Sequence, residues 1–222
     1  MQRLTASLPA GHMQGMDLWY EADKLVFAWA NQPDYFKEVM WESDQGFDDW
    51  PNGLSGPSLL YEIDLESGDL RQLTNHPYNS DVEPAYLPSG DIVFSSTRSN
   101  FGSQCSGSFF QDKKITNLYK VSPDGRNLRS MSNNKDFDRY TTVMHDGQLL
   151  FTRWEYQERH LWHTHNLWTA RPDGSYTEAI FKQHNHGPMS LRDARQIPGS
   201  KKLVAIGGGH HEWAQGAVFI ID

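Results

Sequence analysis

The chain has 222 residues and a formal net charge of −8, from 28 acidic and 20 basic side chains. No basic stripe runs along the sequence, which argues against a phosphate-backbone partner such as nucleic acid. No apolar stretch is long enough to span a bilayer, which excludes a membrane-spanning segment within this sequence.

The apolar residues fall into short, aromatic-rich runs that are separated by polar turns. Aromatic side chains make up 13% of the chain, and such runs are typical of β-strands rather than of helices. The single cysteine, Cys105, excludes an internal disulfide and a CxxCH haem attachment. The first residues lack the apolar core of a signal peptide, so we expect the signal of an exported parent protein to lie outside this sequence.

In chain order, the pattern predicts a short N-terminal lead-in, 1–14, followed by four repeats of four strands, which we name A to D. The repeats cover about 15–75, 82–133, 138–182 and 191–222. In each repeat, strands A and B form a hairpin around a tight turn. These A–B hairpins lie at 18–27, 85–94, 142–151 and 195–204.

Strands C and D of each repeat form a second hairpin with closely similar sequences. These hairpins begin at Leu60, Leu118 and Leu167, and the last two turn at Pro-Asp-Gly. Pro presets φ and Gly tolerates a positive φ, so this tripeptide predicts a tight turn. The fourth hairpin begins at Val218 and stops before its strand D.

The spacing of the repeats predicts the fold class. The interval from Leu60 to Leu118 is 58 residues, and from Leu118 to Leu167 it is 49 residues. Four strands repeated at about 40 to 50 residues predict a β-propeller, with loop insertions accounting for the excess. A β-sandwich is the alternative, but sandwiches rarely repeat one hairpin pair so regularly. We therefore expect an all-β chain of about four four-stranded blades, the last incomplete, that forms part of a larger propeller.

The strand order predicts two different ends of the blades. The A–B and C–D turns are tight and share one end, whereas the B–C and D–A connections leave from the other end. We call this second end the long-loop end. Function concentrates in loops that a rigid scaffold holds, so we expect the long-loop end to carry it. Eight of the ten histidines are predicted there: His76, His160, His163, His165, His184, His186, His210 and His211.

Close pairs among these histidines suggest a metal site. Neutral imidazole binds divalent metals, and Zn²⁺ or Mn²⁺ is the candidate ion, although no cofactor follows with certainty from the sequence. No pair has the HExxH spacing, so a solvated or hydrogen-bonded loop histidine is the alternative for each. The candidate metal ligands are Cys105, His163, His165, His184, His186, His210 and His211.

Polar residues at the ends of the B strands suggest acid–base chemistry. The candidate catalytic residues are Arg98, Arg153, Glu155 and His211. An arginine that neutralises a carboxylate, with His or Glu as base, suits elimination or hydrolysis of uronate sugars. The alternative is that Arg153 and Glu155 end a strand with ion pairing and cation–π contacts. No GxSxG, P-loop or GxGxxG motif is present, so hydrolase, kinase and dinucleotide-binding functions have no support.

Several segments resemble a known family. The strings DLWYEADKLVFA, EPAYLPSGDIVFSSTRS, NLYKVSPDGRNLRSMS, LLFTRWEYQER and ARQIPGSKKLVAIGGGHH look like the middle domain of the hydrazine synthase alpha subunit. The resemblance runs from about Gly11 to Asp222, and a looser one extends to TolB-type and WD40-like propeller repeats. It implies an exported, periplasmic propeller domain beside c-type cytochrome domains, with haem held only by those neighbouring domains.

The resemblance also carries over certain positions as typical of the family. They are Arg98 with Cys105, the segment 152–155, and His210 with His211. Cys105 is the one that the resemblance makes a candidate metal ligand near an adjoining haem.

Three functions remain open from the sequence. The first is a scaffold and binding domain that contacts neighbouring domains, subunits or a small ligand through the long-loop end. The second is a TolB-like polysaccharide lyase with a histidine-bound metal and a carbohydrate substrate. The third is a protein-binding scaffold with no small-molecule site.

Overall fold

The computed structural model describes residues 4–31, 57–99, 115–155, 165–181, 187–209 and 216–222. These residues form β-strands and turns without any helix, so the all-β prediction is confirmed. None of the described segments forms a helix of the length and apolar character that crossing a bilayer requires.

The first two repeats each form an antiparallel four-stranded sheet. We call them the first and second units. The first unit has the order β1 (Gly11–Leu18), β2 (Lys24–Asn31), β3 (Leu59–Asp64) and β4 (Leu70–Gln72). The second has the order β5 (Asp81–Tyr86), β6 (Ile92–Ser96), β7 (Asn117–Val121) and β8 (Arg129–Ser130). Strand β1 includes the end of the segment that was expected to be the lead-in 1–14.

The last two repeats are linked into one seven-stranded sheet. The third unit comprises β9 (Phe137–Val143), β10 (Leu149–Trp154), β11 (His165–Ala170) and β12 (Glu178–Phe181). The fourth comprises β13 (Ser190–Gln196), β14 (Leu203–Gly208) and β15 (Ala217–Ile221). A single parallel bridge between His165 and Ser190 joins the two units. All other pairings in this sheet are antiparallel.

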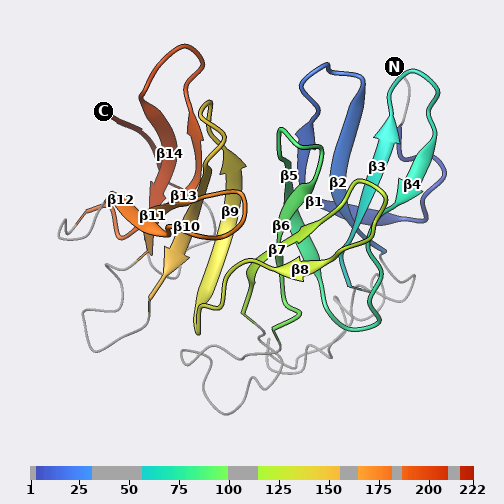
Figure 1. Ribbon diagram of the computed structural model, residues 1–222, viewed down its shortest axis with the longest axis horizontal. Coiled ribbons are helices and arrows are strands. Elements are labelled where there is room, and N and C mark those ends of the chain that lie inside the picture. Colours follow the sequence, from blue (N-terminus) through green and yellow to red (C-terminus); the bar gives the residue numbers. More distant parts are fainter. Residues whose placement is uncertain (1–3, 32–56, 100–114, 156–164, 182–186, 210–215) are drawn as a thin grey trace, which may run out of the picture.

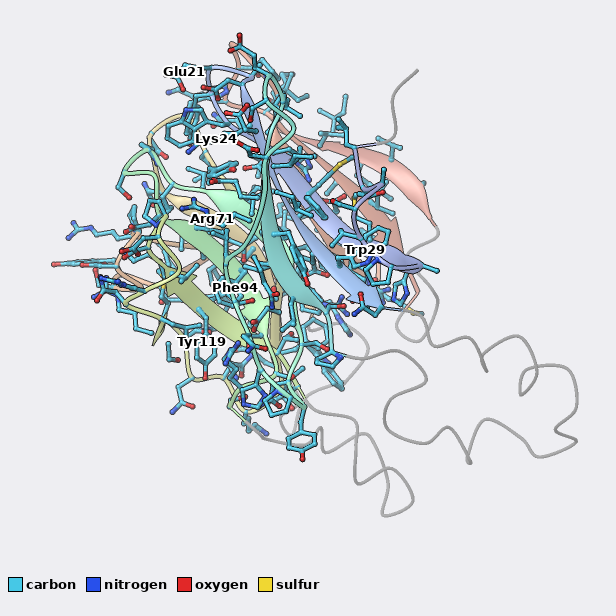
Figure 2. The ribbon with its side chains drawn as sticks, turned by 90° about the vertical axis from the view of Figure 1, so that its right-hand side faces the viewer. Glu21, Lys24, Trp29, Arg71, Phe94 and Tyr119 are labelled. Carbon is cyan, nitrogen blue, oxygen red and sulfur yellow. The ribbon has the colours of Figure 1, made fainter. Side chains whose placement is uncertain are left out.

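Neighbouring units pack through apolar faces. One buried cluster lies between the first and second units, another between the second and third, and another between the third and fourth. Because side chains alternate along a strand, Val26 and Ala28 face the second unit, while Phe27 and Trp29 join a cluster on the other face of the first unit. Figure 2 shows Trp29 and Lys24 toward opposite ends of β2.

The first strand of every unit lies at the centre of the fold. Strands β1, β5, β9 and β13 contact one another in sequence, and Figure 1 shows β5 and β9 beside each other at the centre. We call these four the inner strands. Each has an irregular register with its neighbour in the sheet. Each also has one residue with positive φ near that irregularity: Gly15 (94°), Glu83 (55°), Tyr140 (57°) and Asp193 (48°).

The strand directions separate two ends of the units, as the sequence predicts. The turns that join β5 to β6 and β13 to β14 lie at the same end, which is the upper one in Figure 1. Since the pairs are antiparallel, β2, β6, β10 and β14 all finish at the opposite end, where β3, β7, β11 and β15 begin. This opposite end is the long-loop end.

Candidate functional site

Two of the predicted catalytic residues, Arg98 and Arg153, form buried ion pairs. Arg153 donates from Nε and Nη2 to the Asp138 carboxylate, at 2.8 and 2.9 Å. Arg98 donates likewise to Asp81, at 3.0 and 2.6 Å. Both carboxylates are fully buried. These bidentate pairs tie the end of a B strand to the start of an inner strand, which is the ion-pairing alternative considered for Arg153.

The surroundings of Arg153 keep it charged. Burial by itself lowers the pKa of a guanidinium, but hydrogen bonding and attraction to Asp138, with a further contribution from Glu155, raise the pKa of Arg153. Its guanidinium also lies 4.8 Å from the centre of a Trp168 ring. Glu155 directly follows β10 and is half-buried.

Among the predicted metal ligands, His165 is the one that the structure describes. It begins β11 and is 3% exposed. Its ring stacks on Trp154, with ring centres 5.2 Å apart and planes inclined by 12°, and Phe137 lies against it at 5.3 Å. The other candidates lie outside the described residues: Cys105, His163, His184, His186, His210 and His211. Within the described part of the chain, no group of three or more His, Cys, Asp or Glu is arranged to hold a metal ion.

The structure adds a site that the sequence reasoning missed. A groove of about 770 Å³ runs along the inner strands at the positive-φ residues. All four units contribute to it, and its lining combines three arginines with two carboxylates. The ionisable and hydrogen-bonding side chains of the lining are Gln14, Glu83, Arg139, Tyr140, Thr141, Arg192, Asp193 and Arg195.

An ion pair joins the second and third units at this groove. Arg139 donates from Nε and Nη2 to Oε1 of Glu83, at 3.1 and 2.5 Å. The other oxygen, Oε2, accepts from the amide of Tyr140 at 2.8 Å and from the hydroxyl of Ser95 at 3.1 Å. Burial by itself lowers the pKa of Arg139, but attraction to Glu83 and Tyr140 and the hydrogen bonds to Glu83 together raise it, so the net shift of the pKa is upward. Glu83 and Arg139 therefore form an ion pair that joins the second and third units.

The second charged pair of the groove, Arg195 with Asp193, has a longer contact distance and is more exposed to solvent. Arg195 Nη2 lies 3.4 Å from Oδ1 of Asp193, and both side chains are 54% exposed. A smaller cavity of about 200 Å³ adjoins the groove and shares Arg195 with it. There Asp17 accepts a hydrogen bond from the Tyr86 amide at 2.9 Å. Burial raises the pKa of Asp17 in spite of that bond.

A signal for the groove was present in the sequence. When the A strands are aligned on their turns, Gly15, Glu83, Tyr140 and Asp193 occupy one column. In a half-buried strand, apolar and polar side chains alternate regularly. That alternation does not explain why one aligned position holds a glycine in the first strand and a polar or charged residue in the other three. Bulges in strands re-aim side chains and are common next to binding sites. The aligned column therefore indicates the groove once the register is known.

The sequence matches no family model and no curated protein sequence significantly. Solved structures are similar in fold. Hydrazine synthase from Kuenenia stuttgartiensis aligns with a TM-score of 0.70 and 14% identity, over 94% of this chain and 31% of that chain. A TolB from Agrobacterium tumefaciens aligns with a TM-score of 0.53 and 14% identity, over 98% of this chain and 60% of that one. An oligogalacturonate lyase in complex with manganese gives 0.57 and 14%, over 90% and 49%.

These similarities concern the fold. Together with the sheets described above they show a TolB-like propeller fold, as the sequence predicted. The chain spans about a third of the length of the hydrazine synthase chain and about half to three fifths of the other two.

Proposed function

We propose that this chain is a scaffold and binding domain of a larger exported protein, and that it contacts neighbouring domains or subunits through its long-loop end. The observation that carries the proposal is the division between the two ends. Short turns close the hairpins at one end, whereas every B–C connection joins strand termini at the other. Binding residues concentrate in such connections when a rigid scaffold positions them.

Ion pairs hold the B strands in place at the end where these connections begin. Arg98 follows β6, and Arg153 lies near the end of β10. Each is held by a fully buried carboxylate at the start of an inner strand. A buried, bidentate pair is costly to break, so it fixes the strand terminus against its neighbour. In this proposal the two arginines are positioning residues for the long-loop end.

For the parent protein, we propose a composition like that of hydrazine synthase. The fold similarity at a TM-score of 0.70 and the motif resemblance support this proposal. Any haem is then supplied by neighbouring domains, because the sequence has no CxxCH. Cys105 is the proposed ligand from this chain to a metal near the contact surface.

The test is association between this chain and the rest of its parent protein, produced as separate polypeptides and titrated by calorimetry. We expect the double variant His210→Ser/His211→Ser, in the connection between β14 and β15, to weaken association by about tenfold or more. The matched control is His145→Ser, because His145 is exposed in a tight turn at the opposite end. Equal affinity of all three proteins, or a loss with His145→Ser alone, contradicts the proposal.

A second candidate is a metal-dependent lyase acting on uronate polysaccharides. The fold similarity to an oligogalacturonate lyase that holds manganese favours it. The proposed ligands are histidines outside the described residues, namely 163, 184, 186, 210 and 211, because His165 is buried between aromatic rings. Metal analysis of the purified chain tests this candidate. Stoichiometric Zn²⁺ or Mn²⁺ that is lost in His211→Ala supports it, and a metal-free protein after loading with either ion rejects it.

A further inference from the structure

The smaller cavity lies where the four inner strands end, beside the tight turns. Its lining includes the last residue of each of these strands: Leu18, Tyr86, Val143 and Gln196. This end is opposite to the long-loop end, so the cavity is a separate place on the molecule. Its volume of about 200 Å³ is below the range of about 300–1,000 Å³ that is typical for drug-sized ligands. A ligand that fits within it is therefore small.

Two polar side chains of the lining already serve the fold. The Gln196 side chain accepts a hydrogen bond from the His145 amide and donates one to the Ser200 carbonyl, both at 2.8 Å. The Thr142 hydroxyl donates to the Ala194 carbonyl at 3.0 Å. These hydrogen bonds hold the ends of β9 and β13 in place, so the two side chains have little capacity left for a ligand.

The cationic side chain of the lining has a carboxylate of its own. Arg195 Nη2 lies 3.4 Å from Oδ1 of Asp193, so their charges offset each other. The acidic side chain of the lining is Asp17. In the described part of the chain, Asp17 takes part in no ion pair. The charge that remains in the cavity is therefore that of a carboxyl group.

The Asp17 carboxyl can accept further hydrogen bonds. Its Oδ2 accepts from the Tyr86 amide at 2.9 Å, and the Leu18 amide also interacts with the carboxyl. A carboxylate has about four acceptor sites, so two amides use only part of its capacity. Burial raises the pKa of Asp17 in spite of these amides and of the attraction to Arg195. Burial disfavours the charged form, and a cationic ligand group beside Asp17 would offset that cost.

Tyr20 provides a second acceptor and an aromatic wall. Its hydroxyl donates to the Tyr86 carbonyl at 3.2 Å, and the hydroxyl oxygen keeps lone pairs that can accept. Tyr20 is 59% exposed, and its ring is held edge-on to Trp19 with ring centres 5.0 Å apart. The face of an aromatic ring attracts cations. The apolar residues of the lining are Leu18, Pro84, Ala85 and Val143.

We propose that this cavity binds the ammonium group of a small organic amine, with Asp17 as its counter-ion and the Tyr20 hydroxyl as a further acceptor. An ammonium group has three donors and no acceptor, which suits a carboxylate beside a hydroxyl oxygen. Charge-assisted hydrogen bonds of this kind are the strong ones. The hydrocarbon part of the amine contacts the apolar residues of the lining. The site lies at the end opposite to the docking surface proposed above, so it can hold or fail independently of that function.

The experiment measures binding of benzylamine to the full chain by calorimetry, at neutral pH and low ionic strength. Benzyl alcohol serves as the uncharged probe of nearly the same shape. We expect saturable binding of benzylamine at one site, and binding of the alcohol that is weaker by about tenfold or more, because the charge-assisted hydrogen bond is lost. Added salt should weaken the binding of benzylamine, because it partly screens the two charges.

Three substitutions in the cavity separate its acceptors from the rest of the lining. Asp17→Asn keeps an oxygen for the Tyr86 amide but removes the counter-ion, so it should weaken binding of benzylamine by about tenfold or more. Tyr20→Phe keeps the ring and removes one acceptor, so we expect a loss of about threefold. The matched control is Thr142→Val, because the Thr142 hydroxyl is already bonded to the Ala194 carbonyl. It should leave the affinity unchanged within about twofold.

The neighbouring charged pair gives two effects of opposite sign. Arg195→Gln removes a cation that repels the ligand, so it should tighten binding of benzylamine by about threefold. Asp193→Asn removes the partner of Arg195, so it should weaken binding by about threefold. The controls Arg171→Gln and Asp173→Asn make the same changes of charge in an exposed turn of the third unit. They should leave the affinity unchanged within about twofold.

Four results overturn the proposal: no saturable binding of benzylamine, equal affinity for the amine and the alcohol, wild-type affinity in folded Asp17→Asn, or the same loss in Thr142→Val as in Asp17→Asn. A thermal melt of every variant checks folding. If Asp17→Asn is unfolded, the comparison of the two probes on the wild type and the affinity of Tyr20→Phe decide the matter. Wild-type affinity in Tyr20→Phe would then contradict the proposal.

Discussion

The faces by which the units pack and the inner strands that line the groove come from the same hairpins but have opposite character. Between units, side chains such as Phe94, Leu118 and Leu167 are at most 2% exposed and belong to buried hydrophobic clusters. Along the inner strands, the Arg195 and Asp193 side chains are 54% exposed. Packing between the units thus buries apolar side chains, whereas the groove-lining side chains of the inner strands include exposed charges.

The difference follows from how the units, on the one hand, and the inner strands, on the other, contact their neighbours. The second and third units bury both faces of their central strands against neighbouring units, so a polar side chain there has to find a partner within the core. The inner strands meet edge to edge, and single side chains bridge them instead: Asp17 to the Tyr86 amide, Glu83 to the Tyr140 amide, and Thr142 to the Ala194 carbonyl. Such bridges leave room for solvent and for a ligand between them.

Truncation of an apolar side chain between units should have the largest effect on stability. Phe94 is fully buried between the first and second units and lies beside Tyr119, with ring centres 6.3 Å apart (Figure 2). We expect Phe94→Ala to lower the free energy of unfolding by about 3–5 kcal/mol, because it leaves a cavity. The control Ile220→Ala, at a side chain that is 64% exposed, should change it by less than about 0.5 kcal/mol. Urea denaturation measures both.

A similar loss in the two variants would mean that the face of β15 is as important for stability as the cores between the units. Phe94→Leu provides a second variant in case the alanine variant does not fold. It removes less volume, so we expect a loss of about 1 kcal/mol.

The turn glycines offer a finer comparison between units. Gly68, Gly125 and Gly174 occupy the C–D turns of the first three units, and all have positive φ, at 78°, 78° and 88°. A Cβ at Gly125 would lie 2.8 Å from the Leu73 carbonyl of the first unit, and one at Gly174 would meet the Met131 carbonyl of the second. A Cβ at Gly68 would meet nothing within 4 Å.

Substituting each of these glycines by alanine therefore separates two costs to stability. One is the strain of a left-handed backbone, and the other is the clash with a neighbouring unit. We expect Gly68→Ala to lower the free energy of unfolding by about 1 kcal/mol, through the left-handed conformation alone. Gly125→Ala and Gly174→Ala should each lose about 2–3 kcal/mol, because the neighbouring backbone has to move as well. Thermal denaturation of the three variants under one condition provides the measurement, and equal losses would show that the turns at Gly125 and Gly174 do not contact the preceding unit in solution.

The sequence predicted the strands well because their signals are local. Alternating apolar residues and Pro-Asp-Gly turns specify hairpins without any knowledge of the neighbours, and the strands β5, β6, β7 and β9 to β11 lie where those patterns placed them. The roles of Arg98 and Arg153 were left open. Their partners, Asp81 and Asp138, precede them by 17 and 15 residues in the chain, and only the pairing register brings them together.

The sequence alone contained only a partial signal for the groove, for a related reason. It depends on Gly15, Glu83, Tyr140 and Asp193, which are far apart in the chain and share a site only because four bulges fall in register. The spacing of Arg139, Arg192 and Arg195 along the chain does not indicate that they line one groove. Charge inside a strand that otherwise alternates is the local clue, and its meaning needs the tertiary arrangement.

The smallest expected effect concerns pH and the edge of the groove. Burial raises the pKa of Asp17, so the folded chain favours the protonated carboxyl. Its contribution to stability is then fully present below the unfolded pKa of about 3.9 and is lost as the pH rises through the higher folded value. Asp17→Asn removes this titration and keeps an oxygen that can accept the Tyr86 amide. We expect the variant to be slightly more stable than the wild type at neutral pH, with the gap closing in acid.

Asp64 provides a control of the opposite sign. Hydrogen bonds from the Ser67 amide and hydroxyl lower the pKa of this exposed carboxyl, so its contribution is present above the unfolded pKa and is lost as the pH falls through the folded one. Asp64→Asn should therefore be less stable than the wild type at neutral pH and converge with it in acid. Melting temperatures of the three proteins across the acidic range decide the matter. If both variants change the melting temperature in the same direction at neutral pH, burial does not favour the protonated form of Asp17. The edge of the groove is then more accessible to water than its packing indicates.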